Sequence, residues 1–412
     1  MHAADLTGID RPLPDIMAPS APGPGFEPDS TVKPGHPSGL TADGRLKSGR
    51  LAGLSMRRAI WVLAWPILIE SVLGSLVGAT DTYVAAQLSE AATDAIGGAS
   101  YLLWFVGLVL MAIGVGATAM ISRAVGAGRL ATARAAVGQT LLIALVLGAC
   151  AGGIIAATAS SVASVMNLND EAVAHFSHYC QVIALGVPFM AVLSSMIACL
   201  RGAGDSYRPL RAMVVVNIVN IFATWILSGV DLKTASVVDG ETVTRTILHN
   251  PFNLDLGVSG IAIGTVIAEG IGAILILRSI SVGTGGVRLT LRRLKPHATT
   301  LARLIRVGIP NFMETLGMWI GNFAVILLVG KLGSGGGGVL GSHIVAIRIE
   351  SFSFQPGFAL GIAAGTLAGQ YLGARSPSHA RRAILICTGL ASVSMGLTGV
   401  LLMLFPTQIT GL

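Results

Sequence analysis

Charged side chains are scarce in this sequence, and that scarcity excludes most classes of soluble protein. Only 11% of the 412 residues are charged, 53% are hydrophobic and the mean hydropathy is +0.75, whereas about a quarter of the residues in a typical soluble domain are charged. Long, predominantly apolar stretches recur along the chain, each sufficient to cross the hydrocarbon core of a bilayer as a helix. The sequence therefore predicts an all-α, polytopic membrane protein.

The sequence motifs of many enzymes and pumps are also missing. No GxxxxGK[ST] phosphate-binding loop occurs, which argues against an ATP-driven pump within this chain, and neither HExxH nor GxSxG is present. The four cysteines lie in apolar runs without metal-ligand spacing, and His175 and His178 have no third ligand nearby. We therefore expect no enzyme, no metal site and no cofactor other than a coupling ion.

The hydropathy pattern divides the chain into a polar tail and nine apolar segments. Residues 1–50 are rich in proline and lack an apolar core segment, so we expect a disordered cytoplasmic tail rather than a signal peptide. The nine apolar segments are predicted to be membrane-spanning helices over 59–86, 94–123, 133–157, 176–200, 208–229, 257–280, 302–331, 339–369 and 379–404.

The breaks between these helices alternate in charge. Most of the 27 basic residues lie in one set of breaks, over 45–58, 123–134, 201–211, 278–306 and 375–382, while the other set is mainly acidic. Positively charged loops remain on the cytoplasmic side of a membrane. We therefore expect a cytoplasmic (inner) membrane protein with its N-terminus inside, in which the net charge of +7 reflects topology rather than nucleic-acid binding.

Two parts of the sequence repeat one another. "WPILIESVLG" and "IPNFMETLGM" each place a proline four residues before a glutamate, as Pro66/Glu70 and Pro310/Glu314. The repeat covers six helices, so both copies enter the membrane in the same orientation, which is a design found in transporters. We predict a first lobe over 57–281 with six helices and a partial second lobe over 300–412 with three.

Several motifs, in order, resemble the MATE (multidrug and toxic compound extrusion) transporters. They are "DTYVAAQL", "LRGAGDSYRPLRAMVVVNIVNI", "LGVSGIAIGTVIAEG" and "SHIVAIRIESFSFQPGFALGIAAGTLAGQYLGA", and the resemblance runs from about residue 57 to 404. It implies a V of two six-helix lobes that exports organic cations in exchange for H⁺ or Na⁺. Against that pattern the second lobe is about three helices short.

The resemblance also implies a cation site in the first lobe. Asp81 matches the carboxylate of that site, Asn217 and Asn220 match amides that line it, and Thr265 matches a threonine beside it. In many prokaryotic members a second acid follows the helix-five asparagine after three intervening residues. Here that position is Thr224, so a site that depends on paired acids must draw on other residues.

Two carboxylates, Glu70 and Asp81, lie within the first apolar segment. Eleven residues separate them, which is three helical turns plus about 20°, so they share one helix face. We expect both to point into a cavity, because ionisable residues within membranes seldom face lipid. Asp81 is predicted to exchange a proton or hold a cation; Glu70 has either that role or a structural one, bound to a neighbouring helix.

The second lobe offers further charged candidates. His343, Arg348 and Glu350 lie in the eighth segment, and Arg348 and Glu350 leave opposite faces of a helix, so each needs a partner elsewhere. Glu314 is a candidate partner for Arg348. A fixed ion pair is one interpretation, and proton transfer by Glu350 or His343 is the other. Glu269, in the sixth segment, is interpreted as structural.

We therefore predict a monomeric secondary antiporter that lies in the lipid bilayer and exports small organic cations or amphipathic compounds. We expect no nucleic-acid partner. Two alternatives remain open. A lipid-linked saccharide flippase shares the superfamily fold but needs a cationic cleft for a pyrophosphate group. A non-transporting product of a shortened gene is the second, because three missing helices leave the second lobe open.

Overall fold

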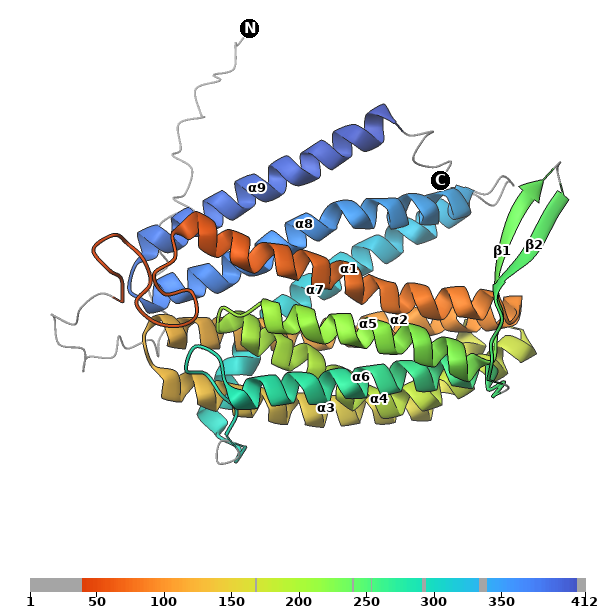
Figure 1. The fold of residues 1–412 in the computed structure, drawn as a ribbon, viewed down its shortest axis with the longest axis horizontal. Coiled ribbons are helices and arrows are strands. Elements are labelled where there is room, and N and C mark those ends of the chain that lie inside the picture. Colours follow the sequence, from red (N-terminus) through yellow and green to blue (C-terminus); the bar gives the residue numbers. More distant parts are fainter. Residues whose placement is uncertain are drawn as a thin grey trace, which may run out of the picture. The chain divides into compact units, whose positions relative to one another are not determined.

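The computed structural model describes residues 39–166, 169–238, 241–252, 254–290, 294–332 and 339–405, without the side chains of 165, 234–244, 323, 326–327 and 329–352. Within these ranges the chain forms nine helices and one two-stranded sheet (Figure 1). The helices are α1 Met56–Ala86, α2 Glu90–Gly126, α3 Leu130–Val165, α4 Asp170–Gly202, α5 Tyr207–Ser228, α6 Gly257–Val282, α7 Ala298–Leu332, α8 Val339–Gly373 and α9 Pro377–Leu404.

All nine predicted helices are confirmed, and most of them extend beyond the predicted bounds at one or both ends. Seven of the described helices, α1 to α6 and α9, are each long and apolar enough to span a membrane. At the starts of α2 and α4 the added turns have polar caps: the Ser89 side chain accepts from the Ala92 amide at 3.0 Å, and the Asn169 side chain accepts from the Ala172 amide at 2.7 Å. Such caps satisfy backbone donors at a helix start, and hydropathy does not register them.

The sheet is a hairpin that sequence analysis did not predict. Strands β1 Leu232–Val238 and β2 Glu241–Leu248 pair antiparallel between α5 and α6. The signal in the sequence is Asp239-Gly240 between two runs of β-branched residues, which favours a tight hairpin. At its base the Asn250 backbone N–H, and then the His249 ring, hold the pKa of Asp231 below its ordinary value.

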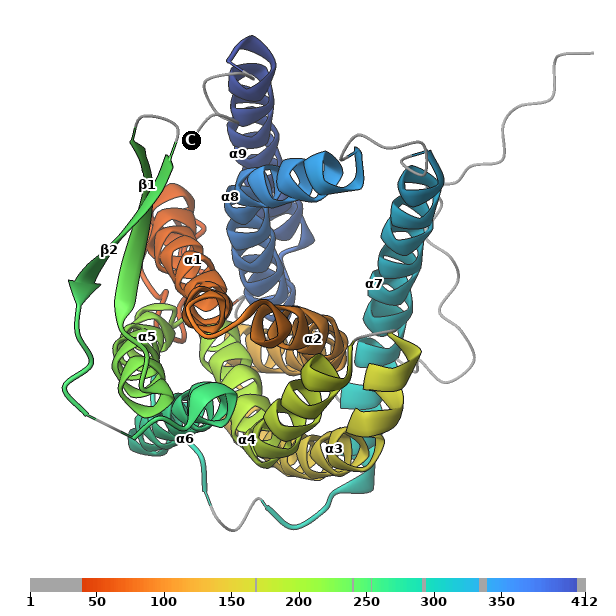
Figure 2. The same ribbon diagram turned by 90° about the vertical axis from the view of Figure 1, so that its right-hand side faces the viewer.

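The helices alternate in direction, so the loops gather at two ends. We call the end with the α2–α3, α4–α5, α6–α7 and α8–α9 connections the basic end, and the opposite one the hairpin end. Helices α1 to α6 pack together, with α5 beside α6 and α4 against α2, α3 and α6 (Figure 2). Two apolar clusters fill this six-helix bundle, one toward each end.

The N-terminal segment, residues 39–55, packs against the basic end. Leu40, Leu46 and Leu51 are buried in a cluster with side chains of α1, α8 and α9. The Ser48 hydroxyl donates to the Val125 carbonyl at 2.6 Å, and the Gly39 amide donates to the Ala374 carbonyl at 3.3 Å. The prediction of a disordered tail over 1–50 is therefore wrong for 39–50, where regularly placed leucines supply enough apolar surface to order the chain; residues 1–38 lie outside the described residues.

Glycines bring α2 and α8 into close contact at the basic end. A Cβ atom on Gly126 would overlap the Gln370 carbonyl, and one on Gly373 would overlap the Arg123 carbonyl. Gly369 lies equally close to the Ser122 side chain. Small residues allow such backbone approach between membrane helices, where the hydrophobic effect adds little.

We predict that Gly126→Ala separates α2 from α8 at the basic end. The added methyl group overlaps the α8 backbone, and overpacking of this kind costs about 1–3 kcal/mol. Spin labels on Arg129→Cys and Arg381→Cys, in a chain whose exposed Cys150 is replaced by serine, should report a longer distance. Gly107→Ala on the same helix is the control, because nothing lies within 4 Å of its added Cβ. Equal distances in both variants would contradict the prediction.

Candidate functional site

Asp81 is buried at the meeting point of four helices. Its side chain is 3% exposed and leaves α1 toward α4, α5 and α6. The Thr265 hydroxyl on α6 lies 3.1 Å from Oδ1 and 2.9 Å from Oδ2, and the Tyr179 hydroxyl on α4 donates to Oδ2 at 3.0 Å. Asn220 Nδ2 on α5 donates to Oδ1 at 3.4 Å. Both oxygens of the carboxylate are thereby satisfied by neutral donors, with no cationic side chain among these partners.

The amides and hydroxyls around Asp81 form a connected network. Asn220 Nδ2 also lies 2.9 Å from Thr265 Oγ1 and 3.3 Å from Thr224 Oγ1. Asn220 and Thr224 are fully buried. Thr224 therefore lies in the site, one helical turn from Asn220, but as a hydroxyl it adds a polar contact without a charge.

The structure brings together most of the predicted first-lobe residues. Asp81, Asn220 and Thr265 make direct contact, whereas Asn217 lies one turn along α5 and donates through Nδ2 to the Met213 carbonyl at 2.9 Å. Tyr179 was missed, because a tyrosine in an apolar segment is ordinarily read as an anchor or core residue. Its place in "HFSHYC" gives no sequence signal for a partner on α1.

Glu70 is buried on the same face of α1 but belongs to a different contact. Its side chain is 5% exposed, and Oε2 lies 2.9 Å from Nη2 of Arg201, which is 15% exposed. Arg201 was assigned to a basic loop; it lies in the last turn of α4 and turns into the bundle, because Glu70 provides a buried counter-charge there. Glu70 and Asp81 are thus both buried and bound to side chains of neighbouring helices, and the expectation that they face a cavity stays a prediction.

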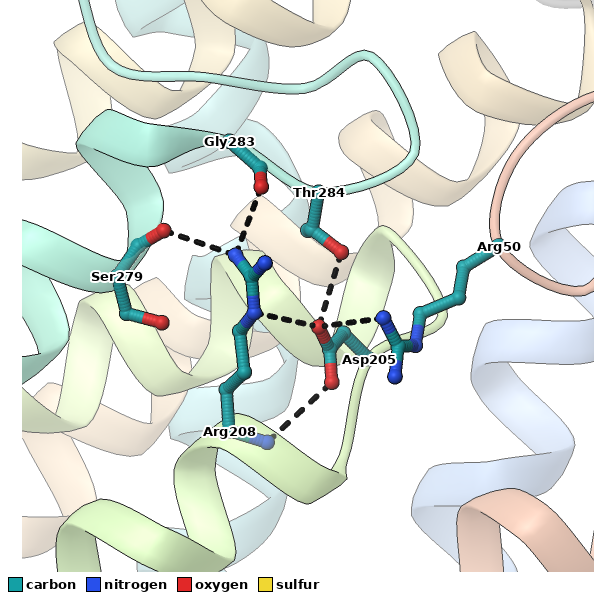
Figure 3. Close-up of polar contacts among 6 residues, drawn as sticks. All are labelled: Arg50, Asp205, Arg208, Ser279, Gly283 and Thr284. Atoms are coloured by element: carbon teal, nitrogen blue, oxygen red, sulfur yellow. Dashed lines mark hydrogen bonds and ion pairs between the residues drawn. The ribbon is translucent and has the colours of Figure 1, made fainter.

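A second polar cluster ties the basic end together (Figure 3). Asp205, in the α4–α5 turn, is fully buried; its Oδ2 lies 3.5 Å from Nη1 of Arg50, 3.3 Å from Nε of Arg208 and 2.9 Å from the Thr284 hydroxyl. Arg208 Nη1 also donates to the carbonyls of Ser279 at 2.9 Å and Gly283 at 2.7 Å. This Asp205 cluster joins the N-terminal segment to the ends of α4, α5 and α6.

The second-lobe candidates are only partly described. Glu314 lies on α7 and is exposed. His343, Arg348 and Glu350 fall within α8, but their side chains lie outside the described residues, so their partners remain predictions. Within the parts of the chain that the structure covers, no group of three or more His, Cys, Asp or Glu side chains is arranged to hold a metal ion.

The sequence matches the family model described as MatE over residues 66–226 and 310–412. These stretches begin at Pro66 and Pro310, the two prolines that mark the internal repeat. The chain is 28% identical over 359 residues to a probable multidrug resistance protein NorM of Thermotoga maritima, covering 85% of this chain and 71% of that protein. It is 25% identical over 366 residues to a probable multidrug resistance protein YoeA of Bacillus subtilis, covering 87% and 73%.

Solved structures share the fold. A crystal structure of MATE in the bent conformation has a TM-score of 0.75 at 23% identity, covering 86% of this chain and 74% of that chain. A multidrug resistance MATE family transporter of the MOP superfamily, in an outward-facing conformation, has a TM-score of 0.71 at 23% identity, covering 87% and 74%. The family match spans more than half of the sequence and agrees with the helical architecture and its repeat. This chain belongs to the MATE family of membrane transporters.

Proposed function

We propose that the protein is a secondary antiporter, not an enzyme, which exports organic cations across the cytoplasmic membrane in exchange for H⁺ or Na⁺. The observation that carries the proposal is Asp81, a buried carboxylate whose partners on α4, α5 and α6 are all neutral. A buried charge without a fixed counter-ion is stabilised by binding a proton or a cation. The multidrug resistance names of its relatives support the same class of substrate.

The coupling follows from competition for that carboxylate. An organic cation and the coupling ion cannot both neutralise Asp81, so loading of one favours release of the other. A ligand shifts a conformational equilibrium by its difference in affinity for the two states. Binding of the ion therefore drives the transporter toward the state that has released its organic cation.

The closed basic end supports an orientation for the cycle. We propose that this end faces the cytoplasm, since it holds most of the arginines of the connections. The α2–α8 contact, the N-terminal segment and the Asp205 cluster then close the cytoplasmic side in this conformation. Opening to the cytoplasm requires α2 and α8 to separate at Gly126 and Gln370.

Ethidium efflux from cells that make this chain tests the proposed function, with expression matched between the strains compared. We propose that the transporting unit is a monomer. We expect efflux to exceed that of cells without the protein and to stop when the gradient of the coupling ion is collapsed, with protons and sodium discharged separately. Efflux that survives collapse of both gradients, or no efflux for any organic cation tried, would overturn the proposal. An altered cell envelope with unchanged drug sensitivity would favour the flippase alternative.

A further inference from the structure

Glu269 is a second carboxylate beside the Asp81 network. It lies on α6 four residues after Thr265, which places it on the same helix face one turn closer to the basic end. The residue is half-buried, yet its Oε2 is buried and has no hydrogen-bond partner among the described residues. Thr265 contacts both carboxylate oxygens of Asp81, so Glu269 lies one turn of α6 from that contact. An orphaned carboxylate oxygen at this depth is costly and needs a partner.

The packing of α5 against α6 places Asn217 at the level of Glu269 and Asn220 one turn nearer the hairpin end. The helices run antiparallel: Gly264 lies against Thr224, and Gly272 lies against Val216. Moving one turn toward the basic end from the Asn220–Thr265 contact therefore leads to Asn217 on α5 and to Glu269 on α6. These two side chains share one level of the bundle.

Both of these α5 amides leave an oxygen without a donor. Asn217 Nδ2 donates to the Met213 carbonyl, and Asn220 Nδ2 donates to Asp81 and Thr265. Within the described part of the chain, Oδ1 of Asn217 and Oδ1 of Asn220 are buried and accept no hydrogen bond. These two amide oxygens and Oε2 of Glu269 make three buried oxygens on adjacent helices that lack hydrogen-bond donors. Both oxygens of Asp81, in contrast, accept hydrogen bonds.

We propose that Glu269 is the second acid of the coupling site, in place of the acid that Thr224 replaces, and that it binds Na⁺ directly with the Asn217 and Asn220 amide oxygens. This inference rests on the proposed function for its choice of site. Asp81, one helical turn away, adds a negative charge that attracts the ion. Glu269 supplies the carboxylate oxygen that is free to bind it. Glu269, interpreted as structural from the sequence, becomes a ligand because its position on α6 meets α5 at the unpaired amides.

The chemistry of the donor set favours Na⁺ over the other candidate ions. A proton on Glu269 satisfies one acceptor, whereas a bare hard cation is held by several carboxylate and carbonyl oxygens at once. Of the three donor-free oxygens only Glu269 Oε2 belongs to a carboxylate, and its single negative charge balances one positive charge. The three donor-free oxygens therefore match a monovalent metal ion.

Thermal unfolding of the purified full-length chain in detergent tests this inference. NaCl is titrated against choline chloride at constant ionic strength, because a ligand of the native state stabilises it by RT ln(1 + [L]/Kd) and so raises the unfolding temperature as its concentration exceeds Kd. We expect Na⁺ to stabilise the wild type, and Glu269→Gln to weaken the apparent Na⁺ affinity roughly 10- to 100-fold, the effect of losing one bond to a charged group. Glu90→Gln, an exposed glutamate of α2, is the matched control and should keep the wild-type response.

Glu269→Asp keeps the charge but shortens the side chain, and we expect it to retain part of the Na⁺ response. The unfolding temperature in choline chloride shows whether a variant still folds when no Na⁺ is present. Together with Glu269→Asp, it separates loss of Na⁺ binding from loss of the fold. An unchanged Na⁺ response in Glu269→Gln would overturn the role of Glu269. Absence of any Na⁺ response in the wild type would overturn the sodium site. Neither result touches the proposed function, which ethidium efflux and Asp81→Asn test independently.

Discussion

Asp81→Asn should abolish organic-cation export while the protein remains in the membrane. Asparagine keeps the size of the side chain and can accept from Tyr179 and Thr265, so the local packing survives. The charge is lost, and an ion pair at about 4 Å in a partly screened site is worth about 4 kcal/mol, close to a thousandfold in ion affinity. Ethidium efflux should fall to the level of cells without the protein.

The control for this variant is Asp94→Asn. Asp94 is exposed near the start of α2, so the same chemical change there should leave efflux unchanged. Immunoblots of the membrane fraction must show equal amounts of all three proteins. Wild-type efflux by Asp81→Asn would remove the residue from the coupling mechanism and leave only the fold and the family.

Arg201→Gln should be the most destabilising single change near the first-lobe site. It leaves the Glu70 carboxylate, which is 5% exposed, without its partner at 2.9 Å. Removing one member of a buried ion pair typically costs about 3–5 kcal/mol, because the remaining charge stays buried. We expect a lower unfolding temperature for the purified protein in detergent, with Arg129→Gln, an exposed arginine at the same end, as the neutral control.

The two partners should respond unequally. Glu70→Gln leaves Arg201, whose long side chain lies in the last turn of α4 and can turn its charge toward the headgroup region. We therefore expect a smaller loss of stability for Glu70→Gln than for Arg201→Gln, and partial recovery in the double variant. A Glu70→Gln protein of normal stability that no longer exports ethidium would contradict this structural role and return Glu70 to the coupling machinery.

The sequence was sufficient to predict the helices and the arginine-rich connections that gather at one end of the bundle, because both depend on local quantities. Hydropathy marks each span, and the alternation of arginine-rich connections orders them. Asp81, Asn220 and Thr265 could be gathered into one site only through the family resemblance. Their positions lie in three separate segments, and no spacing along one helix brings them together.

Contacts between distant segments are what the sequence could not predict. In the sequence, Arg201 is one more basic residue at a helix end, and only the tertiary structure shows that it forms an ion pair with Glu70 on α1. Asp205 likewise lies in an arginine-rich connection, where its burial depends on Arg50 and Thr284 from other parts of the chain. Glu269 depends in the same way on the register between α5 and α6.

Competition between an organic cation and the coupling ion at Asp81 is the central claim, and equilibrium binding measures it most directly. Radiolabelled tetraphenylphosphonium is bound to the purified protein and displaced by raising the H⁺ or the Na⁺ concentration at constant ionic strength. We predict that one of these ions displaces the label from the wild type and that the displacement curve of Asp81→Asn is flat. Identical displacement curves for the two proteins would contradict the account.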